Sequence, residues 1–128
     1  MNLIDTFEAF KRKQNNFVIK VERDSFIKPK KFKNGKYLNF YIRIYIAYGE
    51  GDYPNVYQLN DITLVKYELH KSYHEPFRTS DSLATSFEIK VWSYGYYPIK
   101  ATIYLKFGKP IEINGMVQFP VSETERNP

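Results

Sequence analysis

The strongest constraint on the fold of this chain is a period of two in its apolar residues. The longest such run covers the odd positions from Ile99 to Phe107, and a second covers the even positions from Phe40 to Ile46. Shorter runs with the same period occur at residues 17–22, 62–69, 87–92 and 111–121. Alternation of this kind buries one face of a β-strand and leaves the other polar. The sequence therefore predicts about seven short strands.

The segments between these runs carry turn residues and read as turns and loops rather than helical crossovers. Loops are expected at residues 28–36, 49–55, 71–84 and 93–97, and Asn114-Gly115 predicts a tight hairpin turn that divides the last run into two strands. Strands joined in this way pair antiparallel, since parallel strands need crossovers. The predicted fold is all-β, an immunoglobulin-like antiparallel β-sandwich, with function expected on its end loops.

The N-terminal segment has a different period. Leu3, Ile4, Phe7 and Phe10 lie on one face of a helix, and three cations at residues 11–13 follow where the helix dipole favours positive charge. We expect a short N-terminal helix within residues 1–14, a sandwich domain over 15–122 and a polar, frayed tail at 123–128. The apolar helix face either packs on the sandwich or docks a partner protein.

Two absences limit the classes of protein to consider. The chain has no cysteine, which excludes disulfides, thiolate catalysis and cysteine-ligated zinc. The sequence contains no apolar run of signal-peptide or membrane-spanning length. We expect a cytoplasmic protein with no membrane partner.

The basic character of the chain belongs to one segment. Residues 11–36 hold ten Lys or Arg against Glu22 and Asp24, a local net of +8, so the remainder is net −3 although the chain totals +5. Phe17, Phe26 and Phe32 are interleaved with these cations, as in nucleic-acid-binding surfaces. Nucleic-acid binding is therefore an alternative function, although basic loops are usually only solvated.

Catalytic motifs are poorly represented. The six glycines are scattered and form no phosphate loop, which leaves nucleotide hydrolysis unsupported. His70 and His74 have a metal-ligand spacing, but their predicted place at a strand end and in a loop does not make the side chains converge. Ser72, His70 and Glu75 contain the residue types of a catalytic triad, but sequence neighbours in an extended chain rarely bring base to nucleophile with an oxyanion hole beside them. We predict no enzyme activity, metal site or cofactor.

Two loops carry a recognisable pattern. The first reads Leu69-His70, then Ser72-Tyr73, Pro76 and Arg78, and the second reads Ser93-Tyr94-Gly95-Tyr96-Tyr97 before the longest alternating run. In this order and spacing the chain resembles the YEATS domain, and the second loop resembles the prokaryotic branch of that family. The resemblance spans residues 38–121 and is best over 62–107. Ser93 stands where the family usually has glycine.

The resemblance implies an immunoglobulin-fold reader, not an enzyme, whose partner is an acylated lysine on a protein or peptide, or a small acyl-amide ligand. It implies that Tyr73 and Tyr94 sandwich the flat acyl-amide, while Ser72 hydrogen-bonds the amide and His70 braces the pocket. The Tyr94 backbone N–H would bind the acyl carbonyl. The implied ligand-binding residues are His70, Ser72, Tyr73, Ser93, Tyr94, Gly95 and Tyr97.

A structural interpretation of the same tyrosines remains open at this stage. Aromatic residues make up 18% of the chain, so loop tyrosines are expected without any function. Tyr73, Tyr94 and Tyr97 could pack and hydrogen-bond locally at the rim of a sandwich. A protein-interaction module without an acyl-lysine pocket is the corresponding alternative function.

Overall fold

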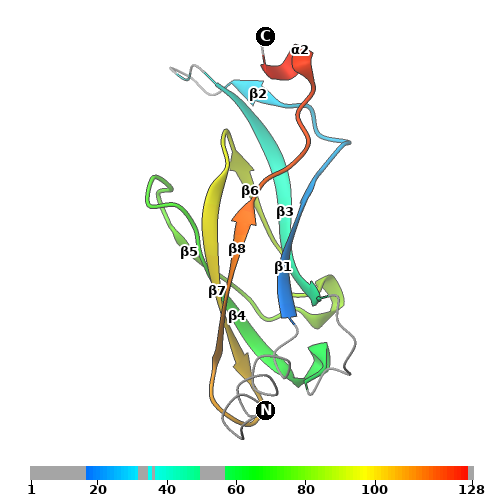
Figure 1. The fold of residues 1–128 in the computed structure, drawn as a ribbon, viewed down its shortest axis with the longest axis vertical. Helices are drawn as coiled ribbons and strands as arrows, with labels where there is room; N and C mark the ends of the chain where they lie inside the picture. Colours follow the sequence, from blue (N-terminus) through cyan, green and yellow to red (C-terminus); the bar gives the residue numbers. More distant parts are fainter. Residues whose placement is uncertain (1–16, 32–34, 36, 50–56, 127–128) are drawn as a thin grey trace, which may run out of the picture.

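The computed structural model describes residues 17–31, 35, 37–49 and 57–126 of the chain. In this part of the chain, eight strands form two antiparallel sheets that pack as a sandwich (Figure 1). The all-β prediction is confirmed, while the predicted N-terminal helix lies outside the described residues. The elements in chain order are β1 (Phe17–Arg23), β2 (Lys30–Lys31), β3 (Leu38–Tyr48), a 3-10 turn (Leu59–Asp61), β4 (Ile62–Glu68), β5 (Phe77–Ser80), a second 3-10 turn (Leu83–Thr85), β6 (Ile89–Ser93), β7 (Tyr97–Leu105), β8 (Ile111–Val117) and helix α2 (Glu123–Arg126).

The first sheet is built around β3. This strand pairs with β1, β2 and β6, and its alternate residues from Phe40 to Ile46 are buried. β-Branched side chains on one face of a strand suit this position because they pack well on a pleated surface. The predicted alternation of Phe40–Ile46 therefore corresponds to the inner face of the central strand.

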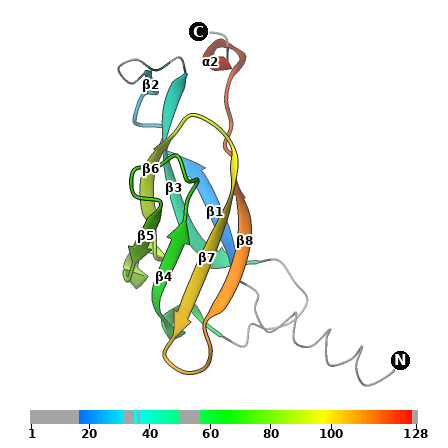
Figure 2. The same ribbon diagram turned by 90° about the vertical axis from the view of Figure 1, so that its left-hand side faces the viewer.

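The second sheet has the order β5-β4-β7-β8. Its inner face contributes Val65, Tyr67, Ile99, Ala101, Ile103 and Val117 to the core. Glu68 at the end of β4 is paired with Lys100 near the start of β7. Because of this register, the loop that follows β4 and the turn that precedes β7 emerge at the same end of the sandwich (Figure 2).

The segment predicted as a loop at 71–84 contains a strand and a helical turn. β5 pairs with β4 at the sheet edge, with Phe77 opposite Glu68 and Ser80 opposite Val65. Phe77 is exposed, and no residue of β5 is fully buried. Backbone pairing with β4 holds this strand in place, and neither of its faces is buried. Its sequence therefore shows no alternation of apolar and polar residues. The loop prediction for these residues is wrong.

The hairpin predicted at Asn114-Gly115 is also wrong, because β8 runs straight through both residues. A Cβ atom on Gly115 would lie 3.2 Å from the Cβ of Ile19 in β1. The glycine thus allows the edge strands of the two sheets to approach closely. The turn into β8 instead follows Leu105 and uses Gly108, whose φ of 95° favours glycine. Phe107 lies in this turn and is 86% exposed, outside the apolar face predicted for it.

The C-terminal tail is anchored rather than frayed over residues 123–126. The Arg23 guanidinium donates hydrogen bonds to both carboxylate oxygens of Glu125 in α2, and its Nη1 also donates to the Pro120 carbonyl at 3.1 Å. The hydrogen bond from Arg23 is the main cause that lowers the pKa of the Glu125 carboxyl to about 2. The tail therefore docks on the sandwich through β1.

The core contains one polar group that fixes the connection into β6. Tyr67 is fully buried, and its hydroxyl donates a 2.6 Å hydrogen bond to the carbonyl of Phe87. Phe87 is buried with a φ of 60°, so β6 begins two residues later than the predicted strand at 87–92. Burial raises the pKa of the Tyr67 phenol, which stays protonated as a donor.

Candidate functional site

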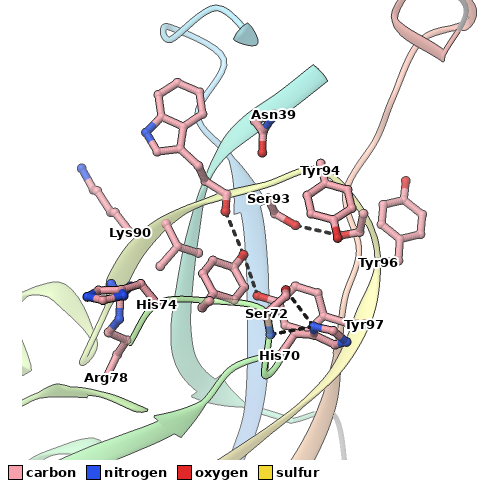
Figure 3. A pocket seen from close by; sticks show the side chains of 14 residues that line it. Asn39, His70, Ser72, His74, Arg78, Lys90, Ser93, Tyr94, Tyr96 and Tyr97 are labelled. Atoms are coloured by element: carbon pink, nitrogen blue, oxygen red, sulfur yellow. Dashed lines mark hydrogen bonds between the residues drawn. The ribbon is translucent and has the colours of Figure 1, made fainter. Parts of the chain in front are cut away.

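A pocket of about 480 Å³ opens where the loop after β4 meets the turn between β6 and β7 (Figure 3). The structure brings all seven predicted ligand-binding residues into its lining. The described residues that line it are Asn39, His70, Ser72, Tyr73, His74, Arg78, Lys90, Val91, Trp92, Ser93, Tyr94, Gly95, Tyr96 and Tyr97. These seven residues were predicted from two loops that are separate in the sequence. The two loops meet because the register of β4 against β7 brings both to the same end of the sandwich.

His70 and Ser72 form a local hydrogen-bonded unit on one wall of the pocket. The backbone N–H of Ser72 donates to Nδ1 of His70 at 3.1 Å, so this nitrogen is the acceptor in that hydrogen bond. The Ser72 hydroxyl lies 2.8 Å from the same nitrogen and must therefore be the donor in that contact. The hydroxyl oxygen keeps lone pairs that can accept a further hydrogen bond, and Ser72 belongs to the pocket lining.

Two linked tyrosine hydroxyl groups connect the residues at the bottom of the pocket. The Tyr97 hydroxyl donates to the Tyr73 hydroxyl at 3.0 Å, which donates in turn to the Trp92 carbonyl at 2.8 Å. The two tyrosine rings meet edge to face with centroids 5.8 Å apart. Tyr97 is buried, and burial is the main cause that raises the pKa of its phenol. The loop after β4 is thereby fixed to β6 and β7.

The ring of Tyr94 is at the opposite, open side of the pocket. It is 56% exposed and stacks on the ring of Tyr37, just before β3, with centroids 5.5 Å apart and an interplanar angle of 15°. Tyr94 follows the last pair of the β3–β6 ladder, Phe40 with Ser93, so its N–H lies past that ladder. Tyr37 is an aromatic contact that the sequence analysis did not identify.

The turn that presents Tyr94 is closed by a side chain. Ser93 is buried, and its hydroxyl donates a 2.7 Å hydrogen bond to the carbonyl of Gly95. A Cβ atom on Gly95 would meet nothing within 4 Å. Serine in place of the usual glycine thus fastens the turn, and Gly95 leaves open space beside the pocket.

Sequence reasoning missed half of the pocket lining. Trp92 precedes the quoted turn and Tyr96 lies within it, so both could have been found from their positions. Arg78 was part of the quoted pattern without a role, and buried Asn39 interrupts the apolar start of β3. Lys90 reads as an ordinary polar position of an alternating strand, so no sequence signal points to it.

The described part of the basic segment is partly engaged within the chain. Arg23 is paired with Glu125, and the Lys30 ammonium lies 4.4 Å from the centroid of the Trp92 ring. Residues 11–16, 32–34 and 36 of that segment lie outside the described residues. Among the described residues, no group of three or more His, Cys, Asp or Glu side chains could hold a metal ion, and no helix has the length and apolar character needed to cross a bilayer.

Comparison with known proteins places this arrangement in a family. Residues 40–115 match the family description "prokaryotic YEATS domain", which covers more than half of the chain. The chain belongs to the prokaryotic YEATS domain family. A search among curated proteins gave no match.

Solved YEATS domains share the fold. The Yaf9 YEATS domain bound to H3K27ac has a TM-score of 0.56 at 16% identity, covering 83% of this chain and 71% of its own. The Yaf9 YEATS domain recognising an H3K122suc peptide has a TM-score of 0.55 at 16% identity, covering 80% and 70%. Yeast Yaf9, an AF-9 homolog, has a TM-score of 0.56 at 17% identity, covering 81% and 69%. At identities of 16–17%, the likeness to these structures shows that this chain has their fold, and no more than that.

Proposed function

We propose that this prokaryotic YEATS domain is a binding module for acylated lysine on a protein or peptide, or for a similar small acyl-amide group. The observation that carries the proposal is the convergence of His70, Ser72, Tyr73, Tyr94 and Tyr97 on one pocket. Family membership supports it, because solved relatives are described as bound to acylated histone H3 peptides. The domain would act by binding and not by catalysis.

The polar part of the pocket suits an amide. An acylated lysine presents one N–H donor and one carbonyl acceptor, where lysine presents three N–H donors and a charge. The Ser72 oxygen is an acceptor because its own proton is engaged by His70. The Tyr94 backbone N–H is the donor that would complete the pair. His70 therefore acts as a positioning residue that sets the direction of the Ser72 hydroxyl.

The aromatic part of the pocket suits a flat group. Tyr73 packs on Tyr97 and Tyr94 packs on Tyr37, so the two predicted sandwich rings are each held from behind by another tyrosine. Rings held in this way lose little conformational freedom when a planar amide stacks on them. An aromatic contact contributes about 0.5–1.5 kcal/mol beyond area burial, and a neutral hydrogen bond about the same. We expect micromolar or weaker binding.

Unmodified lysine is disfavoured by the charges at the pocket. Arg78 and Lys90 both line it, so an ammonium would lose its hydration and approach two like charges. Acylation removes the positive charge and leaves an amide and an apolar tail. The pocket therefore selects the acylated form by both attraction and repulsion.

A calorimetric titration with matched acetyl-lysine and unmodified peptides tests the proposal. The acetylated peptide should bind and the unmodified peptide should not, and Tyr94→Ala should weaken the binding by about tenfold because it removes a stacking surface. Phe107→Ala is the control, since Phe107 is also an exposed aromatic residue but follows the far end of β7. Equal binding of both peptides, or equal loss in both variants, contradicts the proposed function.

A further inference from the structure

The pocket has a basic side that an amide and its apolar tail would not require. Lys90, Arg78 and His74 are on one side of it in this view, while Tyr94 and Tyr96 are on the other (Figure 3). None of the described residues that line the pocket is Asp or Glu. The cations therefore face ligand space without a carboxylate of the lining beside them.

The charges of this side are not neutralised by the rest of the described chain. None of the ion pairs among the described residues includes Lys90, Arg78 or His74. Arg78 donates through Nε to the Glu75 backbone carbonyl at 2.6 Å, which uses one of its five N–H donors. This bond holds the guanidinium in place and leaves the remaining donors for another acceptor.

Lys90 faces a further cation across the sheet. Its cross-strand partner is Arg43, and like charges in directly opposed positions are unfavourable. Glu22 and Glu88 are both paired with Arg43, and Asp24, which lines a small hollow together with Lys90, accepts a 3.0 Å hydrogen bond from the Phe26 backbone N–H. Lys90 would therefore gain more from an incoming carboxylate than an isolated surface lysine.

The depth of these side chains indicates which part of a ligand they meet. Lys90 and His74 are exposed and Arg78 is half-buried, whereas Ser93 and Tyr97 in the floor are buried. An acyl tail enters toward the floor, and the peptide that carries it runs across the rim. The basic side chains lie at the level of the peptide.

We propose that the natural ligand carries an Asp or Glu side chain next to its acylated lysine, and that this carboxylate binds between Arg78 and Lys90. The inference rests on the proposed function and adds a sequence preference to it. The planar fork of Arg78 matches a carboxylate, and Lys90 adds a second charge-assisted hydrogen bond. The partner is thus an acidic segment of a protein.

The test compares acetyl-lysine peptides of one sequence in which the flanking residues are acidic, neutral or basic. The acidic peptide should bind about fivefold more tightly than the neutral one, as expected for a partly exposed charge pair, and the basic peptide more weakly. Lys90→Gln and Arg78→Gln should each reduce this preference, and the double variant should abolish it. Lys109→Gln, which removes the same charge beyond the far end of β7, should leave it unchanged.

The outcomes separate this inference from the proposed function. If acetylation is required for binding but the flanks have no effect, the carboxylate site is wrong and the reader function stands. If acidic peptides bind equally well without the acetyl group, the reader function is wrong. A succinyl-lysine in the neutral peptide provides a further arm. A gain over acetyl-lysine that depends on Arg78 and Lys90 would assign these cations to the acyl tail and overturn the proposal for the peptide.

Discussion

The Nδ1 atom of His70 lies 2.8 Å from the hydroxyl oxygen of Ser72 and 3.1 Å from its backbone nitrogen. One imidazole nitrogen thus accepts from both donors of a residue two positions away. The contact fixes the hydroxyl as a donor toward the ring and as an acceptor toward the pocket. In the proposed complex, His70 would act on the ligand through Ser72 without having to touch it.

This relationship predicts a non-additive pair of substitutions. Ser72→Ala removes the acceptor and should weaken acetyl-lysine peptide binding by about two- to tenfold, the range for one neutral hydrogen bond. His70→Ala frees the hydroxyl and should cost less. The double variant should bind like Ser72→Ala alone, because His70 has nothing left to orient. Affinities from calorimetry for the four proteins test this, and fully additive losses contradict a positioning role.

The hydroxyl chain from Tyr97 to Tyr73 predicts a difference in stability. Tyr73→Phe removes the group that accepts from the buried Tyr97 hydroxyl, which leaves that hydroxyl unsatisfied at a cost of about 1–3 kcal/mol. Tyr97→Phe leaves Tyr73 bonded to the Trp92 carbonyl and should cost about 0.5–1.5 kcal/mol. Urea unfolding measures both. A smaller loss of stability for Tyr73→Phe than for Tyr97→Phe would contradict this order of donors, in which the Tyr97 hydroxyl donates to the Tyr73 hydroxyl.

The ion pair between Arg23 and Glu125 predicts a pH dependence at the C-terminal tail. Its hydrogen bonds lower the pKa of the Glu125 carboxyl from 4.5 to about 2, so the folded chain binds this proton less readily than the unfolded chain. The contribution is complete above about pH 4.5 and is lost as the pH falls toward 2. Urea unfolding should show the native chain to be more stable than Glu125→Gln above about pH 4.5, and this difference in the free energy of unfolding should shrink as the pH falls toward 2. A difference in stability that does not change with pH would exclude the Arg23–Glu125 ion pair as the source of the pH dependence.

Close packing at Gly115 predicts that even a methyl group is too large there. In Gly115→Ala the new Cβ would lie 3.2 Å from Ile19 and 3.6 Å from Ile99, so β1 and β8 must separate. We expect a loss of about 1–3 kcal/mol, the usual range for overpacking. Asn114→Ala, at the exposed neighbouring position of the same strand, is the control. Equal stability of the two variants would mean that the strands can adjust freely.

The parts of the fold that bury a face were readable from the sequence. β3, β4 and β7 each place apolar side chains at alternate positions, so hydrophobic periodicity identified them. β5 was missed because it is an edge strand held by backbone pairing alone. Gly115 was assigned to a turn because the sequence does not distinguish a glycine that a turn requires from a glycine that the close approach of two strands requires. Only the packing of β8 against β1 distinguishes these cases.

The site was predictable where it is local and not where it depends on pairing. His70, Ser72 and Tyr73 lie in one loop, and Tyr94 lies in a turn with a recognisable pattern. Lys90 lines the pocket because of the register of β6 against β3, and Tyr37, which is not among the lining residues, supports it by stacking on Tyr94. These contacts join residues more than 45 positions apart, which a pattern along the chain cannot place.

The most direct measurement is a titration of isotope-labelled protein followed by NMR. The peptides carry unmodified, acetylated, crotonylated or trimethylated lysine in one sequence. The backbone amide signals of Ser72, Tyr73 and Tyr94 should shift with the two acylated peptides alone, while those beyond the far end of β7 stay in place. Equal shifts with the unmodified or trimethylated peptide, or no shift in this pocket with any peptide, would contradict the account of this domain as an acyl-lysine reader.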